Sequence, residues 1–210
     1  MKYIYGILMI GLTAMSCQKE AKDNIQEKGQ LLLQFSHYVK AEPLNFTDDY
    51  TNAHGESYTV NGFKYYVHDI KLVNDKNETI TASADYYLVN EEISNSKTIA
   101  VDIPAGNYTS ISWLLGVDST RNVSGAQTGA LDQGLGMFWT WASGYIMAKL
   151  EGHSPASTMG GQAFTYHVGG FKVPYVTSRT ITLPFSHNLT LAADASITVA
   201  VKADIDTWFS

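Results

Sequence analysis

Residues 30–39 of this chain read QLLLQFSHYV, and their alternation of apolar and polar side chains decides the fold class. Alternation of this kind places every second side chain on the same face of an extended strand. The residues that would share one face are Leu31, Leu33, Phe35, His37 and Val39. The stretch therefore predicts a β-strand that buries one face and carries a histidine on it.

Similar segments recur along the chain, with turn signals rich in Gly, Pro, Asn and Asp between them. Further strands are expected at 58–73, 84–89, 98–103, 108–117, 145–150, 164–168, 179–191 and 197–205. In the longest of them, Tyr66, His68, Ile70 and Leu72 are predicted to share one face. Because no long amphipathic helix is evident, the sequence predicts an all-β fold, an antiparallel β-sandwich of about nine strands with long loops and at most short helical turns.

Composition excludes several classes of protein. The 210 residues are 45% apolar and 16% charged, which is too apolar for a disordered chain and too sparsely charged for a coiled coil. Lys and Arg together number 14 against 20 for Asp and Glu, a net charge of −6. A nucleic-acid-binding protein needs a basic surface, so no nucleic-acid partner is expected.

The first 29 residues predict export and lipid anchoring. Residues 1–16, MKYIYGILMIGLTAMS, combine a basic start with an apolar run too short to span a bilayer as a mature helix. The string Ala-Met-Ser-Cys at 14–17 resembles the lipobox of a bacterial lipoprotein signal, in which Cys17 is lipidated and anchors the chain to a membrane. A plain signal peptide with a chance cysteine is the alternative. Residues 17–29 then form a flexible tether and 30–210 a single folded domain in the cell envelope, periplasmic or associated with the outer membrane.

The sequence shows no sign of catalysis. Cys17 is the only cysteine, so neither an intramolecular disulfide nor a cysteine-based metal cluster is possible. No G-x-S-x-G serine motif and no phosphate-binding glycine loop is present. Nothing in the sequence brings Asp132 and Glu151 together as a carboxylate pair. We therefore expect a protein that is not an enzyme.

Histidines are the better lead to function. The four that fall in predicted strands are His37, His68, His167 and His187. A neutral imidazole among apolar neighbours needs either a hydrogen-bond partner or a metal ion. Imidazole nitrogens suit copper and zinc, and no pair of these histidines is close in sequence. Any metal site would have to be assembled from separate strands.

Two other groups of residues have both a structural and a functional interpretation. Residues 136–145, GMFWTWASGY, would either close one end of the sandwich with buried aromatic rings or line a binding site. Asp118, Asn122 and Asp132 lie in a glycine-rich loop, where carboxylate and amide oxygens would either hold a hard cation such as calcium or cap turns. The absence of EF-hand spacing favours the capping role.

A combination of short strings resembles the MbnP family, the copper-binding proteins associated with methanobactin operons and their relatives in Bacteroidetes-type bacteria. The strings are LQFSH at 33–37, YYVHDIKL at 65–72, GVD at 116–118, GALD at 129–132, GMFWTWASGY at 136–145, KLEG at 149–152 and YHVGG at 166–170. The aromatic run is the most specific of them, and the resemblance extends over nearly all of residues 30–210.

The resemblance implies a secreted or periplasmic β-sandwich that binds copper. In some methanotroph members the copper is held by histidines together with a tryptophan oxidised to kynurenine, and a diheme partner enzyme of the MauG type is implicated in that oxidation. On this basis His37 and His167 are the first candidates for ligands and His68 the third. Trp139 and Trp141 match the aromatic motif and are candidates for a modified or site-lining ring.

The function predicted from the sequence is therefore copper binding at the cell envelope by imidazoles from separate strands. Replacing His37 and His167 by Ala is expected to abolish binding while the fold survives. The alternative is an envelope binding module without a metal, which recognises a glycan or a protein partner through exposed aromatic side chains.

Overall fold

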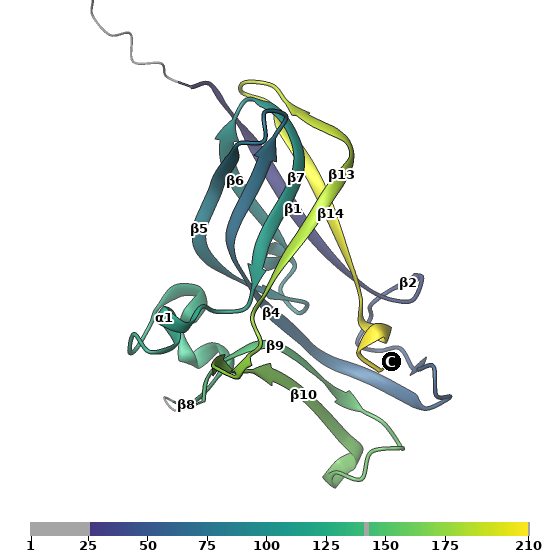
Figure 1. Ribbon diagram of the computed structural model, residues 1–210. Coiled ribbons are helices and arrows are strands. Elements are labelled where there is room, and N and C mark those ends of the chain that lie inside the picture. Colours follow the sequence, from purple (N-terminus) through teal and green to yellow (C-terminus); the bar gives the residue numbers. More distant parts are fainter. Residues whose placement is uncertain (1–25, 141–142, 210) are drawn as a thin grey trace, which may run out of the picture.

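The computed structural model describes residues 26–140 and 143–209 of the chain, and it confirms the all-β prediction (Figure 1). The longer strands are β1 (Lys28–Val39), β4 (Ser57–Asn74), β5 (Thr79–Asn90), β6 (Thr98–Pro104), β7 (Gly106–Leu115), β9 (Gly144–His153), β10 (Ala163–Gly169), β13 (Arg179–Leu191) and β14 (Ser196–Asp204). The short ones are β2 (Glu42–Pro43), β3 (Tyr50–Thr51), β8 (Phe138–Thr140), β11 (Phe171–Lys172) and β12 (Tyr175–Val176).

Helices are few and short in this part of the chain. One α-helical turn is present, together with five 3₁₀ turns. They are α1 (Ser119–Asn122), η1 (Ser94–Lys97), η2 (Gly129–Leu131), η3 (Gln133–Leu135), η4 (Gly160–Gln162) and η5 (Ile205–Phe209). Among the described residues, no helix has the length and apolar character needed to cross a bilayer.

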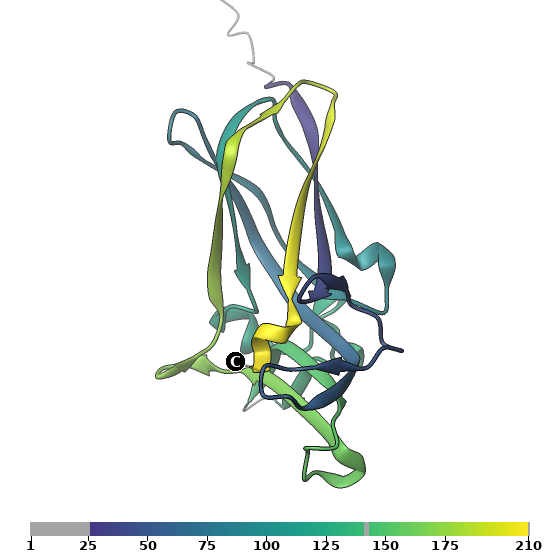
Figure 2. The same ribbon diagram turned by 90° about the vertical axis from the view of Figure 1, so that its right-hand side faces the viewer.

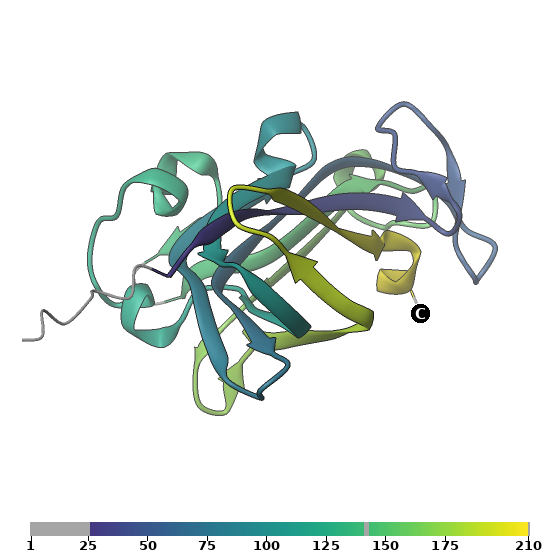
Figure 3. The same ribbon diagram turned by 90° about the horizontal axis from the view of Figure 1, so that it is seen from above.

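The smaller sheet is built around β1. One edge of β1 pairs with β14 in parallel, and the other pairs with β6 and β2 in antiparallel fashion. Viewed from above, β1 and β14 run side by side across the molecule (Figure 3). The first and the last strands of the domain are therefore neighbours.

The larger sheet follows the order β10-β9-β4-β7-β13, and β5 pairs with the other edge of β4. Strand β4 has two successive neighbours along the same edge. Its residues 59–65 pair with β9, and its residues 67–74 pair with β7. The segment between β7 and β9 leaves the sheet at this junction, where the Gly116 amide donates to the Tyr66 carbonyl oxygen at 3.0 Å.

The main core lies between the two sheets. The alternation predicted for the first strand is confirmed, because its odd-numbered residues from Leu31 to Val39 are buried. They pack against alternate residues of β4 and β7, among them Tyr65, Val67 and Trp113. We call the sheet faces that border this core the inner faces, and the opposite ones the outer faces.

The prediction that Tyr66, His68, Ile70 and Leu72 share one face of β4 is wrong for the residues after Asp69. Asp69 has a positive φ of 52°, and the pairing of β4 with both β5 and β7 shifts between His68 and its successors. Opposite β7, this β-bulge gives β4 one extra residue and inverts its alternation beyond Asp69. Ile70 and Leu72 join the inner core, whereas Tyr66 lies in a separate outer cluster and His68 shares its side of the strand.

The outer cluster is a second, smaller core on the outer face of the larger sheet. Its buried members are Tyr66, Val117, Leu131, Met137, Tyr145, Ile146, Met147 and Phe171. The segment after β7, with α1 and the turns η2 and η3, covers it (Figure 1). This cover brings Asp118, at the start of α1, close to His68 on the sheet.

Candidate functional site

His37 lies on the inner face of β1 with its side chain fully buried. Its Nδ1 is hydrogen-bonded to Oε2 of Glu91, and its Nε2 lies 2.9 Å from the hydroxyl oxygen of Tyr65. The rings of Phe63 and Tyr65 stand edge-on to the imidazole, with centroids 4.8 and 5.5 Å away. A neutral ring that donates from Nδ1 to a carboxylate accepts the tyrosine proton at Nε2. Both ring nitrogens of His37 are therefore engaged within the protein.

Glu91 completes this buried network. Burial disfavours its ionised form, but hydrogen bonds from His37 and Lys97 outweigh that effect and hold the pKa of the carboxyl below its usual value. The Lys97 ammonium lies 2.8 Å from Oε1. On the other side of the ring, burial raises the pKa of Tyr65, and the nearby Glu91 charge raises it further. The network therefore holds an ionised carboxylate and a neutral phenol, an arrangement that stabilises the sandwich.

His167 lies in the outermost strand β10. Its Nε2 is 2.8 Å from Oε1 of Glu151, whose other oxygen is 3.1 Å from the Lys149 ammonium. Burial alone would raise the pKa of Glu151, but these two partners lower it below the usual value. The ring of Trp139 lies beside the imidazole, with centroids 6.1 Å apart. The structure thus brings together two residues that the family resemblance singles out.

His37 and His167 lie on opposite faces of the larger sheet. His167 pairs with Lys149, which in turn pairs with Lys64 of β4, so these three side chains share the outer face. His37 packs on Phe63 and Tyr65, which flank Lys64 and face the inner core. The backbone of the sheet separates the two imidazoles. They do not form a shared metal site in this structure.

His68 lies on the outer face of β4, directly opposite Tyr86 of β5. The two rings are stacked, with centroids 3.9 Å apart and planes 5° from parallel. The Nδ1 atom of His68 lies 3.2 Å from the carbonyl oxygen of Asp85, which can only accept a hydrogen bond. In the neutral ring this leaves a lone pair on Nε2.

That nitrogen faces Asp118. The distance from Nε2 to Oδ2 is 3.6 Å, which is too long for a hydrogen bond. The Tyr86 hydroxyl donates to the same carboxylate oxygen. Burial opposes ionisation of Asp118, but hydrogen bonds from Tyr86 and from the backbone N–H groups of Arg121 and Thr120 hold its pKa below the usual value, and a protonated His68 would lower it further. A lone pair and an anionic oxygen thus face one another.

The gap between these two atoms fits a bound cation. With metal–ligand bonds of about 2.0–2.1 Å, two ligand atoms on one ion are separated by roughly 3–3.6 Å for bond angles between about 90° and 120°. The side chains of His68 and Asp118 are 15% and 35% exposed, so an ion can reach them from solvent. The alternative occupant of the gap is a proton on Nε2. His68 and Asp118 are therefore the donor pair that best fits a metal.

Larger ligand groups are not formed in the described part of the chain. Across residues 26–140 and 143–209, no three side chains among His, Cys, Asp and Glu converge as metal ligands do. His187 lies exposed on β13. Cys17 and Trp141, predicted as the lipid attachment site and a possible site-lining ring, lie outside the described residues.

The capping interpretation of the glycine-rich loop is confirmed. Asp118 accepts from the Arg121 amide at 3.0 Å and caps α1, and Asp132 accepts from the Gly134 amide at 2.7 Å and caps η3. The side-chain amide of Asn122 donates to the carbonyl oxygens of Val117 and Asp118. These oxygen atoms do not converge on one point, because each satisfies a separate turn.

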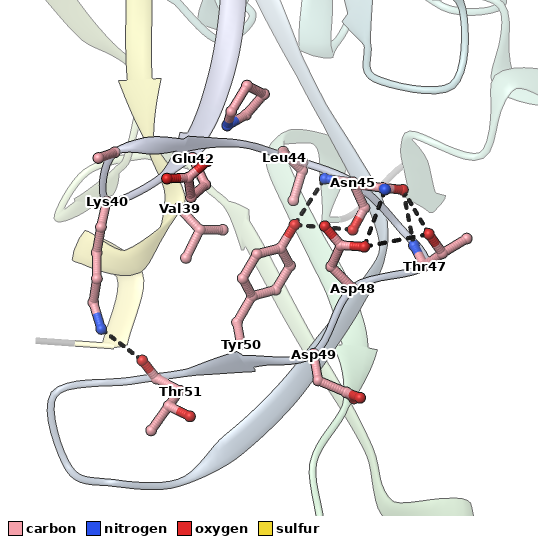
Figure 4. A pocket seen from close by; sticks show the side chains of 12 residues that line it. Val39, Lys40, Glu42, Leu44, Asn45, Thr47, Asp48, Asp49, Tyr50 and Thr51 are labelled. Carbon is pink, nitrogen blue, oxygen red and sulfur yellow. Dashed lines mark hydrogen bonds between the residues drawn. The ribbon is translucent and has the colours of Figure 1, made fainter.

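A broad hollow of about 930 Å³ lies within the loop after β1 (Figure 4). Its polar groups are bonded to one another. Asn45 Nδ2 lies 3.1 Å from an oxygen of Asp48, the Tyr50 hydroxyl donates to the Asn45 carbonyl oxygen at 3.0 Å, and Lys40 donates to the Thr51 carbonyl oxygen at 2.7 Å. These bonds shape the loop, and we assign no function to the hollow.

A second hollow, of about 300 Å³, lies beside Trp139, the ring that neighbours His167. Trp139 forms one wall and Tyr175 another, and these side chains are 41% and 76% exposed. Gly169 and Gly170 line it as well. A Cβ atom on Gly169 would lie 2.4 Å from the Trp139 ring, so only glycine allows the indole to lie this close to the strand.

Sequence reasoning missed the partners that define these sites. Glu91, Glu151 and Tyr86 come from strands or turns whose pairing with the histidines depends on sheet register. The strand that contains Tyr86 is evident in the sequence, and so is the turn between it and β4. Two register shifts around Ile70, with the extra residues on β5, nevertheless displace the register that the turn alone would give.

Comparisons with known proteins agree with this architecture. The sequence pattern of the MbnP family matches residues 28–210. The solved structure of MbnP from Methylosinus trichosporium is similar, with a TM-score of 0.56 and 15% sequence identity over 76% of this chain and 72% of that one. At that identity the likeness concerns the fold alone. No curated protein sequence matches. Because the family pattern spans almost the whole described chain, the protein belongs to the MbnP family.

Proposed function

We propose that this chain is a lipid-anchored copper-binding protein of the cell envelope, and that His68 and Asp118 provide its central ligand pair. The observation that supports this most directly is the 3.6 Å gap between His68 Nε2 and Asp118 Oδ2. Membership of the MbnP family favours copper over other metals. The lipobox at 14–17 supports anchoring through Cys17.

Each residue of the proposed site has a definite task. The Asp85 carbonyl oxygen fixes the His68 tautomer, in the way that hydrogen-bonding neighbours orient metal-bound imidazoles. Stacking on Tyr86 holds the ring plane, and the N-cap bond to Arg121 holds the Asp118 carboxylate. Protons compete with a metal ion for the imidazole nitrogen, so binding should weaken in mildly acidic solution. When bound, the metal would supply redox and Lewis-acid chemistry at this surface.

His167 and Trp139 form the second part of the proposal. Trp139 is exposed enough to be reached by a partner protein, and it lies against an imidazole. The family resemblance implies a diheme enzyme of the MauG type as the oxidant of a tryptophan. We propose Trp139 as the ring that such a partner would reach.

Replacing His68 by Ala is expected to weaken copper binding by more than about 100-fold, because loss of a ligand should exceed the 10–100-fold effect of losing a group that only orients a ligand. Isothermal titration of the chain from residue 18 onward with Cu(I) and Cu(II) measures the affinity. His187→Ala, an exposed histidine on β13, is the matched control and should bind as the wild type does. Equal affinities for wild type and His68→Ala would refute the site. If tight copper binding is lost only in His167→Ala, the metal site lies on β10 instead.

A glycan-binding role is the second candidate function, and the hollow beside Trp139 and Tyr175 favours it. Exposed aromatic faces over a glycine-lined floor suit stacking against sugar rings.

Under this second hypothesis, Trp139→Ala should reduce affinity for a bound oligosaccharide at least about 10-fold, since the stacking of one large ring is worth about 1.4 kcal/mol or more. The measurement is titration of wild type and variant against a panel of neutral and acidic oligosaccharides. Val123→Ala, which alters an exposed apolar side chain elsewhere, is the control. If wild-type protein binds no member of the panel, the glycan hypothesis fails and the copper proposal is unaffected.

A further inference from the structure

The ligand pair of the proposed site consists of two different donors. His68 contributes an imidazole nitrogen, and Asp118 contributes a carboxylate oxygen 3.6 Å from it. Both side chains are partly exposed, so water can complete the coordination of an ion held between them. Nitrogen and oxygen donors in a tetragonal arrangement are typical of Cu(II), whereas thiolate and thioether sulfurs select Cu(I). The donor atoms of the pair therefore match the divalent ion.

The charge of the carboxylate favours the same oxidation state. Asp118 accepts hydrogen bonds from the Tyr86 hydroxyl and from the Arg121 amide, and both bonds stabilise the ionised form. The Coulomb attraction of an anionic ligand for a divalent ion is about twice its attraction for a monovalent ion at the same distance. The guanidinium of Arg121 is hydrogen-bonded to Gln127, with Nη1 3.4 Å from Oε1. The Asp118 charge therefore remains available to an ion in the gap.

The sulfur atoms of the described residues are engaged, buried or on another loop. The Met147 sulfur accepts a hydrogen bond from the Val117 amide at 3.0 Å. Met137 is fully buried in the outer cluster. Met159 lies in the loop between β9 and β10, which projects at the lower end of the molecule in Figure 2. The pair itself contains no soft donor that would favour Cu(I).

We infer that the His68–Asp118 site takes copper as Cu(II) and discriminates against Cu(I). The inference rests on the proposed function, because it concerns the ion held by the same two residues. The ligand is the hydrated divalent ion, which exchanges part of its water for one imidazole nitrogen and one carboxylate oxygen. Cu(I) gains no sulfur ligand from the pair and less attraction from its charge.

Competition titrations of the chain from residue 18 onward measure both affinities. The competitor is nitrilotriacetate for Cu(II) and bicinchoninate, under anaerobic conditions, for Cu(I). The wild type is expected to bind Cu(II) at least about 10-fold more tightly than Cu(I). Asp118→Asn keeps an oxygen ligand and an N-cap side chain but removes the negative charge. It should weaken Cu(II) binding at least about 10-fold and Cu(I) binding less than about threefold.

Two variants serve as controls. Asp132→Asn alters the N-cap aspartate of η3 in the same way and should change neither affinity by more than about twofold. Met137→Leu nearly conserves the volume of a buried side chain and removes its sulfur, so it should also leave both affinities within about twofold. In the electron paramagnetic resonance spectrum, the Cu(II)-loaded wild type should show coupling to one imidazole nitrogen, and His68→Ala should lose this signal.

Two results would overturn the inference while the proposed function stands. The first is a wild type that binds Cu(I) as tightly as Cu(II), with both affinities lost in His68→Ala. The second is an equal loss of both affinities in Asp118→Asn, which would mean that the carboxylate acts only by holding the fold. Loss of Cu(I) binding in Met137→Leu would overturn it as well, because a sulfur would then belong to the site. If His68→Ala binds both ions as the wild type does, the proposed function itself fails.

Discussion

His37→Ala is expected to lower the free energy of unfolding by about 3–5 kcal/mol, the range observed when one partner of a buried ionic network is removed. The change leaves Glu91 with Lys97 as its remaining charged partner and deprives the buried Tyr65 hydroxyl of its acceptor. It also leaves a cavity where the imidazole packs on Phe63. Urea denaturation followed by tryptophan fluorescence measures the loss.

His167→Ala is the matched control for this experiment. It removes a histidine–glutamate pair as well, but the side chains of His167 and Glu151 are 24% and 29% exposed, and water can replace the lost bond. A loss of at most about 1 kcal/mol is expected. Equal losses in both variants would show that the His37 network contributes no more than a surface pair.

The buried network of His37, Glu91 and Tyr65 changes what replacement of His37 measures. From sequence alone, replacement of His37 and His167 is expected to abolish copper binding while the fold survives. Because both nitrogens of His37 are engaged, the His37 replacement tests stability, and loss of copper binding through unfolding would say nothing about ligation. His68→Ala is the informative substitution, because its ring lies near the surface of the outer cluster.

Gly152→Ala is expected to cost about 3 kcal/mol or more, at the upper end of the range for overpacked cores. A Cβ atom at this position would lie 1.9 Å from the Thr59 carbonyl oxygen and 2.5 Å from the Phe164 ring. The Thr59 oxygen belongs to the backbone of β4 and cannot rotate away. β4 and β9 would have to separate at the place where their pairing is already irregular.

Gly106→Ala provides the control for Gly152→Ala, because a methyl group at this position would have no other atom within 4 Å and its φ is not positive. That substitution should leave the free energy of unfolding unchanged or raise it by up to about 1 kcal/mol, because Ala reduces the conformational entropy of the unfolded chain. Thermal and urea unfolding of the two variants give the comparison. A Gly152→Ala protein as stable as the wild type would mean that β4 and β9 are further apart than described.

The first strand shows what sequence can predict. Its buried and exposed residues alternate over the whole of 30–39, and the structure reproduces this pattern. Prediction succeeds there because successive side chains of an extended strand point to opposite faces. Local alternation of apolar and polar residues is therefore enough to show which face is buried.

The geometry around His68 shows where sequence reasoning ends. The turn after β4 pairs Val73 with Thr79, and the same register continued would place His68 opposite Ala84. Two register shifts, one on each side of Ile70, each place an extra residue on β5, and the partner of His68 is therefore Tyr86, two residues further along. These irregularities in the β4–β5 pairing therefore decide which ring stacks on the imidazole, and nothing in the local sequence announces them.

The separation of His37 from His167 has a similar origin. Each histidine occupies a strand of regular alternation. Alternation assigns a side chain to one face of its own strand, but it does not tell how that face lies relative to the faces of the other strands. That relation depends on the register of β4, β9 and β10, which is a property of long-range pairing. The family resemblance named the right scaffold but did not supply this information.

The parallel pairing of β1 with β14 has a consequence for how the chain reaches its native state. Ser36 and Val201, which are bonded across this pair, are 165 residues apart in sequence. Such contacts raise the contact order of a protein and slow its folding. One edge of the first strand must also wait for the last strand to be synthesised, so a chain shortened before residue 196 would expose that edge and much of the apolar core to aggregation.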